Sequence, residues 1–250
     1  LGIQEIHIFD DTFNLNKKRV IEMCEEIIKR GLKISWTSRV RADPFDREML
    51  TIMKKSGCVR LHVGVESLNP VSLENMKKQI TLQHLKDFFI LCNELKINTL
   101  AYFIIGFPEE DEAYWDSFYK TLTSMKPTYI YLNVLYPLAK TQLYQDTMDN
   151  LYHRDHWTEF FNNPTPNYQL PLSRTPELQD KLVGLMDQVH KKFYLSPRFI
   201  VSDLMRNTSS KMLFRKAKLA VRMVFADSRS KMMNTTSHHS APYVTQRETS

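Results

Sequence analysis

The residues best suited to chemistry in this chain stand at the ends of five apolar segments. Each segment runs into a polar end or one that carries glycine or proline; the five are Ile6–Asp11, Ile34–Arg39, Leu61–Ser67, Tyr102–Pro108 and Tyr131–Pro137. Helical patterns separate them, and strands that alternate with helices predict an α/β fold with a parallel sheet. Small molecules bind at the carboxyl ends of such strands. The polar ends are therefore the predicted site.

Charged groups at the first two ends suggest ligand binding. Asp10 and Asp11, followed by Thr12, would accept hydrogen bonds from an amine or bind a divalent metal, although a hard cation needs about six oxygen ligands and no second acidic cluster is visible. Arg39, directly after Ser38, offers a planar fork that fits a carboxylate. The structural alternatives are an ion pair between Arg39 and one of the two aspartates, and helix capping, for which Asn14 or Asn16 is better placed.

The third and fourth ends suggest binding of a nucleoside. Glu66 ends a strand just after Gly64, where a missing side chain lets a ligand approach. A carboxylate at that point can accept hydrogen bonds from both hydroxyls of a ribose. Gly106-Phe107-Pro108 predicts a tight turn on which a flat ring could stack, although the tripeptide alone would mark only a loop.

Side-chain alternation separates two faces of the predicted strands. One parity is apolar, and the other carries Glu5, His7, Ser35, Thr37, His62, Gly64, Glu66, Tyr131 and Asn133. A closed eight-stranded barrel fills its interior mainly with Val, Ile and Leu, so a polar interior predicts a wider or partly open barrel that holds a ligand. A one-sided sheet with a solvated face is the alternative, and histidines satisfied within a core are the alternative for His7 and His62.

Composition limits the class of protein. The 250 residues carry a net charge of +6, but residues 1–197 hold 24 Lys and Arg against 25 Asp and Glu, while residues 198–231 hold 9 against 2. Local basicity of this kind does not predict a nucleic-acid partner. Cys24, Cys58 and Cys92 are far apart and match no short metal-ligand motif, so we expect buried structural thiols in a cytoplasmic protein.

Helical periodicity predicts the intervening elements. Helices are expected over 16–30, 46–56, 70–77, 81–96, 110–125 and 175–194, with an irregular lid or docking loop over 155–168. The basic, apolar segment 211–222 predicts either peripheral contact with an anionic membrane surface or a solvated helix docked on the barrel. Residues 226–250 have the composition of a disordered tail.

Taken together, these segments resemble the radical S-adenosylmethionine (SAM) superfamily. The branch that they resemble binds cobalamin and includes the anaerobic magnesium-protoporphyrin ester cyclase and the hopanoid and phosphinate methylases. The matching text runs from Ile3 to Tyr144; its motifs are Ile8–Phe13, Trp36–Val40, Met53–Cys58, Val63–Ser67, Tyr102–Glu110 and Tyr136–Tyr144. The last motif departs from the family, because the usual Pro-Gly-Thr is replaced by Leu138-Ala139-Lys140-Thr141.

The resemblance implies a partial (β/α)6 TIM-like barrel that begins here at its second strand. Residues 1–145 would form this barrel, 146–225 a helical extension and 226–250 the tail. In the family, the first strand precedes a Cys-x3-Cys-x2-Cys segment that binds a [4Fe-4S] cluster, and a cobalamin domain lies further upstream. None of the three cysteines has that spacing, so we expect a carboxyl-terminal portion whose cluster-binding and cobalamin-binding half is missing, with no metal ligands of its own.

The resemblance also implies a role for each site residue. The cofactor-binding set is Asp10, Asp11 and Thr12 near the SAM amino group, Ser38 and Arg39 near its carboxylate, Glu66 on the ribose with Gly64 and Ser67 beside it, and Ile104, Ile105, Gly106, Phe107, Asn133 and Leu135 around the adenine. No catalytic residue is assigned. The divergent segment 138–194 would set the substrate.

The implied activity is reductive cleavage of SAM to a 5′-deoxyadenosyl radical, or cobalamin-mediated methyl transfer. The outcome would be methylation or oxidative cyclisation of an unactivated carbon or phosphorus in a small-molecule or lipid-like substrate, with electrons from a donor such as ferredoxin or flavodoxin. An isolated fragment of this kind would be inactive. Two alternatives are a noncatalytic remnant that keeps some SAM affinity, and an ordinary barrel lyase or aldolase, which would need a strand lysine that is absent.

Overall fold

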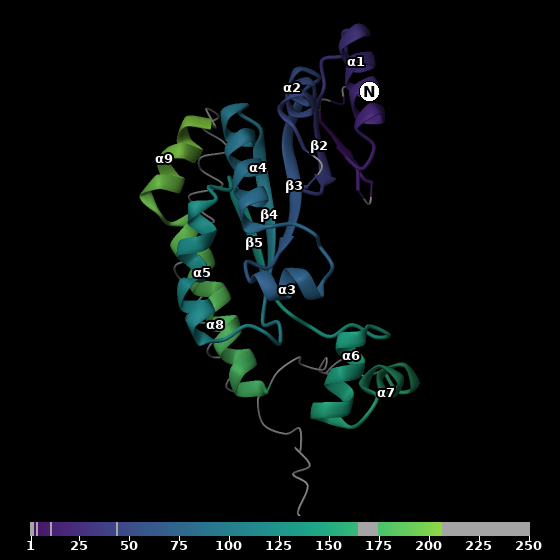
Figure 1. Ribbon diagram of the computed structural model, residues 1–250, viewed down its shortest axis with the longest axis vertical. Helices are drawn as coiled ribbons and strands as arrows, with labels where there is room; N and C mark the ends of the chain where they lie inside the picture. Colours follow the sequence, from purple (N-terminus) through teal and green to yellow (C-terminus); the bar gives the residue numbers. More distant parts are fainter. Residues whose placement is uncertain (1–2, 4, 11, 44, 165–174, 207–250) are drawn as a thin grey trace, which may run out of the picture. The chain divides into compact units, whose positions relative to one another are not determined.

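The computed structural model describes residues 3, 5–10, 12–43, 45–164 and 175–206 (Figure 1). The chain divides into two compact units. The first comprises Leu1–Leu135 with Thr175–Met186, and the second comprises Tyr136–Arg174 with Asp187–Ser250. The predicted domain divisions at residues 145 and 225 stay predictions.

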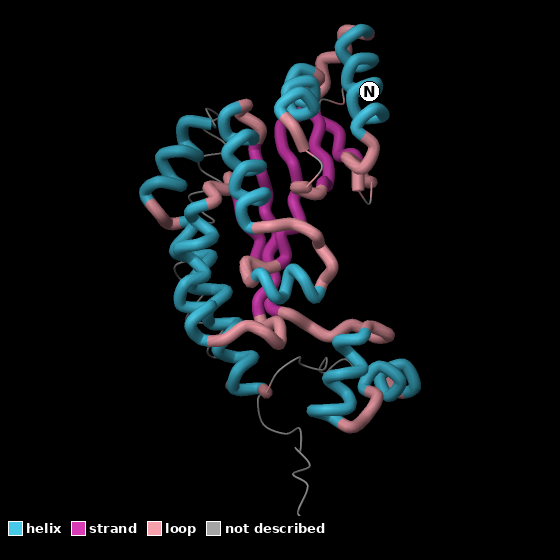
Figure 2. Tube along the Cα trace, viewed as in Figure 1, coloured by secondary structure: helices cyan, strands magenta, loops and turns pink. Residues whose placement is uncertain are grey.

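Five parallel strands form the sheet of the first unit, drawn in magenta in Figure 2. They are β1 (Glu5–Ile8), β2 (Ser35–Val40), β3 (Cys58–Glu66), β4 (Asn98–Ile105) and β5 (Tyr129–Val134). They pair in chain order from β1 to β5, always parallel, so β1 and β5 are the two edges among the described strands. The predicted α/β class and its parallel sheet are confirmed, and the five described strands do not close into a barrel.

The helices of this unit start where the sequence supplies a cap. They are α1 (Lys17–Lys29), α2 (Arg47–Lys55), α3 (Pro70–Asn75), α4 (Leu82–Glu94) and α5 (Glu112–Ser124). Their caps are Asn16, Asp46, Asn69, Thr81 and Asp111, and each cap side chain accepts a backbone N–H of the first turn. Asn16, one of the two asparagines expected to cap, therefore caps α1. Five of the six predicted helices are these, and the sixth, expected over 175–194, is α8 (Pro176–Tyr194).

The end of α2 depends on a glycine. Gly57 has φ +101°, and a Cβ there would lie 2.1 Å from the carbonyl oxygen of Ile34. Only glycine permits both the left-handed backbone and this close approach. Trp36, which is fully buried, donates its indole N–H to the carbonyl of Ser56 at 3.2 Å. The turn is thus fixed against the start of β2.

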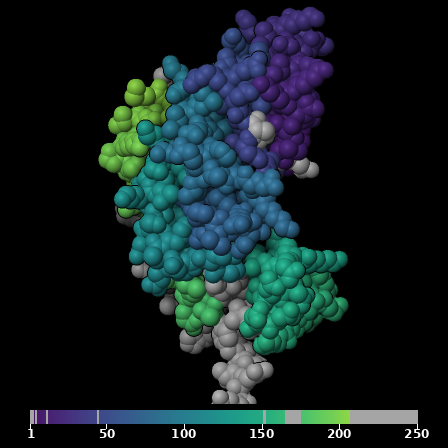
Figure 3. Space-filling model, viewed as in Figure 1, coloured from purple at the N-terminus to yellow at the C-terminus, as the bar shows by residue number. Residues whose placement is uncertain are grey.

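The two faces of the sheet have different surroundings. On one face Leu61, Val63, Phe103 and Leu132 are at most 1% exposed, and α4 and α5 lie along this side of the sheet (Figure 1). Figure 3 shows the surface that the side chains form in the view of Figure 1. Alternate residues of β3, β4 and β5 point to the opposite face, where they are only half-buried or exposed. That open face carries the candidate site.

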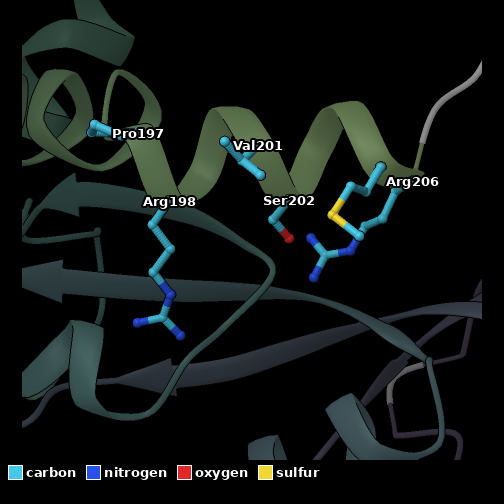
Figure 4. A pocket seen from close by; sticks show the side chains of 6 residues that line it. Pro197, Arg198, Val201, Ser202 and Arg206 are labelled. Carbon is cyan, nitrogen blue, oxygen red and sulfur yellow. The ribbon is translucent and has the colours of Figure 1, made fainter.

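The second unit is helical in its described part. It contains α6 (Gln142–Thr147), the π-helical turn Met148–Tyr152, α7 (His156–Asn162), the last turns of α8 (Pro176–Tyr194) and α9 (Pro197–Arg206). Figure 4 shows a hollow along α9, lined by Pro197, Arg198, Val201, Ser202, Met205 and Arg206. None of the described helices is long and apolar enough to cross a membrane. Segment 211–222 and the tail 226–250 lie outside the described residues.

The expectation of an irregular segment over 155–168 is wrong for its first half, because α7 occupies 156–162. Asp155 caps this helix and accepts hydrogen bonds from the Thr158 hydroxyl at 2.7 Å and the Tyr144 hydroxyl at 2.7 Å. These donors lower the pKa of Asp155 to about 2. The aromatic and asparagine content suggested a loop, but the cap is strong enough to start a helix.

Candidate functional site at the carboxyl ends of the strands

Five of the predicted site residues share the open face near the carboxyl ends of neighbouring strands. They are Arg39 on β2, Gly64 and Glu66 on β3, Ile104 on β4 and Asn133 on β5, and each is half-buried or exposed. Register places Ile104 beside Asn133, and Arg39 beside His62, two residues before Gly64. The fold therefore brings a cation, a carboxylate, an amide and a glycine to one face of the sheet, near the carboxyl ends of its strands.

Other predicted site residues lie on the covered face or behind the edge. Ser38 is fully buried, and its hydroxyl donates weakly to the backbone carbonyls of Ile8 and Arg39, both at 3.3 Å. Ile105 is fully buried, and Leu135 is 8% exposed and donates its N–H to the Ile105 carbonyl at 2.8 Å. Ser38 and Ile105 are the chain neighbours of Arg39 and Ile104, and period-two alternation sends such neighbours to opposite faces of the sheet. Leu135 follows the end of β5, where it is buried.

Arg39 is exposed and stacks on an aromatic ring. Its guanidinium carbon lies 4.3 Å from the centre of the Phe9 ring, and it forms no ion pair with another described residue. The alternative pair of Arg39 with Asp10 is not formed, because Asp10 pairs with Arg19 at 2.7 Å. Asp10 also accepts the N–H of half-buried Thr12 at 3.3 Å. Asp11 lies outside the described residues.

Glu66 ends β3 in a left-handed backbone conformation, with φ +69°, after a register irregularity between residues 64 and 66. Left-handed backbone is uncommon outside glycine and gathers at functional sites. The carboxylate turns back over Gly64, where an added Cβ would lie 2.5 Å from Oε1 of Glu66. Lys78 donates to that same oxygen at 3.0 Å. In this structure the space left by Gly64 thus holds the Glu66 carboxylate.

The turn after β4 is built around a buried carboxylate that sequence reasoning missed. Glu110 is 5% exposed and accepts hydrogen bonds from the N–H of Gly106 at 2.7 Å, the indole of Trp115 at 3.2 Å and the hydroxyl of Ser67 at 2.9 Å. Burial raises the pKa of Glu110, and the three donors oppose that shift. Glu110 stands four residues after the glycine, a spacing that could have suggested a turn-stabilising acid.

Gly106 and Phe107, which were predicted to border the adenine, are both buried in this turn. Gly106 has φ +101°, and a Cβ there would lie 2.9 Å from Cδ1 of Leu182, while Phe107 is 9% exposed. Ser67 is fully buried, and its hydroxyl also lies 3.3 Å from that of Tyr114. The Tyr114 hydroxyl in turn accepts the N–H of Leu68 at 3.1 Å. Ser67 therefore links the ends of β3 and β4 rather than facing the open side.

Further from the carboxyl ends of the strands, the open face carries imidazole and phenol rings that contact one another. His7 shares a hydrogen bond with Thr37 at 2.7 Å, and His62 shares one with Tyr102 at 2.9 Å. The two imidazole rings are 5.2 Å apart, and the ring of Tyr131 follows at 5.6 Å from Tyr102. Burial and then the charges of His7, Arg60 and Arg39 lower the pKa of His62 to about 4. His62 is thus neutral at neutral pH.

The three cysteines do not fit a metal cluster. Cys24, Cys58 and Cys92 are buried and free, and burial raises the pKa of each thiol. Thiolates are the form that binds metal, and a raised pKa disfavours it. Within the described ranges, no group of three or more His, Cys, Asp or Glu side chains could hold a metal ion.

Comparison with known proteins decides the family. The model of the Radical SAM superfamily matches residues 1–122, which extend from β1 to α5. Residues 1–122 form a radical SAM domain. The resemblance found in the sequence motifs is confirmed, and the open edge described above falls mostly within the matched region.

Curated relatives carry methyltransferase and cyclase names. An uncharacterised methyltransferase of Pyrococcus horikoshii is 30% identical over 205 residues, which is 81% of this chain and 43% of that protein. The anaerobic magnesium-protoporphyrin IX monomethyl ester cyclase of Cereibacter sphaeroides is 28% identical over 78% of this chain and 31% of its own length. The chain spans between 31% and 43% of the first three such relatives.

A solved structure shares the fold. The cobalamin-dependent SAM radical enzyme OxsB, solved with aqua-cobalamin and SAM bound, is 18% identical and superposes with a TM-score of 0.51. The match covers 93% of this chain and 39% of OxsB. At this identity the likeness concerns the fold alone.

Proposed function

We propose that this chain is the SAM-binding, carboxyl-terminal part of a cobalamin-dependent radical SAM enzyme. The reaction class is radical methyl transfer to, or oxidative cyclisation of, an unactivated carbon or phosphorus. The observation that carries the proposal is that Arg39, Glu66 and Asn133 share the open face of a parallel sheet near the carboxyl ends of its strands. The radical SAM domain of residues 1–122 and the methyltransferase and cyclase names of relatives support it.

Each group at this edge suits one part of SAM. The guanidinium of Arg39 would bind the carboxylate of the methionine moiety, and Asp10 with Thr12 would face its amino group. The Glu66 carboxylate would accept hydrogen bonds from the ribose hydroxyls, while Ile104 and Asn133 would border the adenine. Once bound, SAM supplies either a methyl group or a 5′-deoxyadenosyl radical; the residues here bind it, orient it and keep it from bulk water.

The finer architecture that we propose is a partial (β/α)6 barrel, with β1–β5 as its second to sixth strands. The cysteines of this chain do not fit an iron–sulfur cluster, so we propose that the cluster thiolates and the cobalamin domain belong to a segment outside the described residues. Electrons would come from a donor such as ferredoxin or flavodoxin. The substrate that we propose is a small molecule or a lipid-like compound, supported by relatives named as a protoporphyrin ester cyclase and a hopanoid methylase.

A noncatalytic module that keeps SAM affinity is the second candidate, favoured by the absence of a thiolate set among the described residues. The two candidates differ in iron content. Anaerobic iron–sulfur reconstitution of the whole reading frame should give about four irons per chain and the absorbance of a [4Fe-4S] cluster if the enzyme is intact. A reading frame that binds SAM but no cluster would establish the noncatalytic module.

Ligand binding to the purified 250-residue chain tests the core of the proposal. Isothermal titration with S-adenosylhomocysteine should show one site, and both Arg39→Gln and Glu66→Gln should weaken binding by about tenfold, the size of one charge-assisted hydrogen bond. Matched controls are Arg47→Gln on α2 and Glu74→Gln on α3, both exposed. Absence of binding, or equal losses in the controls, would contradict the proposal.

A further inference from the structure

We infer that Lys78 is a positioning residue that holds the Glu66 carboxylate in place for the ribose of the bound nucleoside. This inference rests on the proposed function, because it concerns the same site. Neither the motifs nor the family resemblance points to Lys78; its contacts do.

Lys78 makes two contacts with the end of β3. Its ammonium donates to the carbonyl of Gly64 and to Oε1 of Glu66, each at 3.0 Å. The side chains of Lys78 and Glu66 are 22% and 25% exposed, so the pair is partly withdrawn from water. A charge-assisted hydrogen bond in such a setting is stronger and less screened by salt than a surface pair.

The contact between Lys78 and Glu66 also depends on the absence of a side chain at Gly64. A Cβ at this position would approach Oε1 of Glu66 to 2.5 Å and Nζ of Lys78 to 3.5 Å. The carboxylate and ammonium therefore meet in space that only glycine leaves open. Glu66 needs this fixed contact, because its own backbone is left-handed and its strand has just lost regular register.

The backbone of Lys78 is itself fixed by hydrogen bonds to Arg41 and Leu73. The Arg41 guanidinium donates to the Lys78 carbonyl at 3.1 Å and binds the Asp43 carboxylate through two nitrogens, at 2.8 and 2.6 Å. The N–H of Lys78 donates to the Leu73 carbonyl at 3.1 Å. A line of contacts thus runs from Asp43 through Arg41 and Lys78 to Glu66. The position of the carboxylate is set by the loops after β2 and α3.

One oxygen of Glu66 is occupied by Lys78, and the other has no hydrogen-bond partner among the described residues. This leaves one acceptor, in a fixed direction, for a ribose hydroxyl. Without Lys78, the carboxylate loses its only hydrogen-bond partner among the described residues and gains rotamer freedom that binding must then remove. Order of this kind lowers the entropy cost of binding.

Titration of the full chain with S-adenosylhomocysteine and with its 2′,3′-dideoxy analogue tests the inference. Wild-type protein should prefer the hydroxylated ligand, and Lys78→Met should weaken its binding by about tenfold while leaving the dideoxy analogue nearly unaffected. Lys78→Arg should recover part of the loss. The matched control is Lys77→Met, an exposed neighbour. Glu66→Gln combined with Lys78→Met should bind no more weakly than Glu66→Gln alone.

Gly64→Ala provides a variant that leaves Lys78 intact. Its methyl group should displace the Glu66 carboxylate and reduce the same preference for the ribose hydroxyls. If Glu66→Gln weakens binding but Lys78→Met behaves like Lys77→Met, the inference is wrong and the proposed function stands. If wild-type protein shows no preference for the hydroxylated ligand, the ribose role of Glu66 fails, and the inference fails with it.

Discussion

The ends of β3 and β4 are held by carboxylates in opposite environments. At the end of β4, Glu110 is buried and accepts three hydrogen bonds from fixed donors. At the end of β3, the Glu66 side chain is a quarter exposed and pairs with one lysine, Lys78. The Glu110 carboxylate is buried and already hydrogen-bonded, so it is not accessible to a ligand and instead stabilises the turn. The Glu66 carboxylate keeps one oxygen available to a ligand. Of two acids at neighbouring strand ends, the buried one therefore stabilises the fold and the partly exposed one can bind a ligand.

Removal of the Glu110 carboxylate should have the largest effect. Glu110→Ala leaves the Gly106 N–H, the Trp115 indole and the Ser67 hydroxyl without their buried acceptor. The free energy of unfolding should fall by about 3 kcal/mol. Chemical denaturation measures this, with exposed Glu74→Ala as the control, which should change stability by less than about 0.5 kcal/mol. Similar losses in the two variants would mean that the buried network does not hold the turn.

Gly106→Ala should cause the second-largest loss of stability. The substitution forces a side chain into backbone with φ +101° and places a Cβ 2.9 Å from Leu182. Strain of this kind costs about 1–3 kcal/mol. Thermal unfolding should show the loss, whereas Gly184→Ala, in open space within α8, should be neutral or stabilising. A neutral Gly106→Ala would show that the turn can relax.

Acid should destabilise the open face through His62. Because the pKa of His62 is lowered to about 4 in the folded chain, the unfolded chain takes up a proton first as pH falls below 6.5. Above pH 6.5 this group does not reduce the free energy of unfolding. Between pH 6.5 and pH 4 the free energy of unfolding should fall by about 1 kcal/mol, a figure reduced to allow for solvent screening. His62→Gln should flatten this part of the stability profile, and exposed His84→Gln should not. An unchanged slope in His62→Gln would contradict the assignment.

The smallest effect should come from the Glu66–Lys78 pair on the stability of the free chain. A partly exposed ion pair contributes about 1 kcal/mol or less. A double-mutant cycle of Glu66→Gln and Lys78→Met, followed by denaturation, should give a coupling energy of this size that shrinks in high salt. Coupling of about 3 kcal/mol would instead place the pair with the structural network of Glu110.

The sequence predicted the helices and strands more accurately than it predicted the contacts between side chains. Cap residues such as Asn16 and Asp46 and the glycines after α1 and α2 act within a few residues, so pattern alone located the helices. The alternation of β3 and β4 likewise separated a buried face from an open one. Helix α5 was expected to begin at Glu110 but begins at Glu112, because Asp111 takes the cap and Glu110 turns inward to distant donors.

The site could be predicted only in part for the same reason. Ser38 and Ser67 stand beside site positions in the sequence, yet their side chains are buried, because adjacent residues of a strand point to opposite faces. Lys78 lies 12 residues from Glu66 on another loop, and nothing in its local sequence indicates that contact. Pairs of this kind appear only when the fold has brought the loops together.

The six glycines of the chain allow a direct test of where the nucleoside binds. In protein labelled with ¹⁵N only at glycine, titration with S-adenosylhomocysteine should shift the amide signals of Gly64 and Gly106. The signals of Gly31, Gly57 and Gly184, which lie at helix ends or within α8, should stay in place. Shifts confined to those three, or no shifts at saturating ligand, would contradict the binding of SAM at the carboxyl ends of β3 and β4.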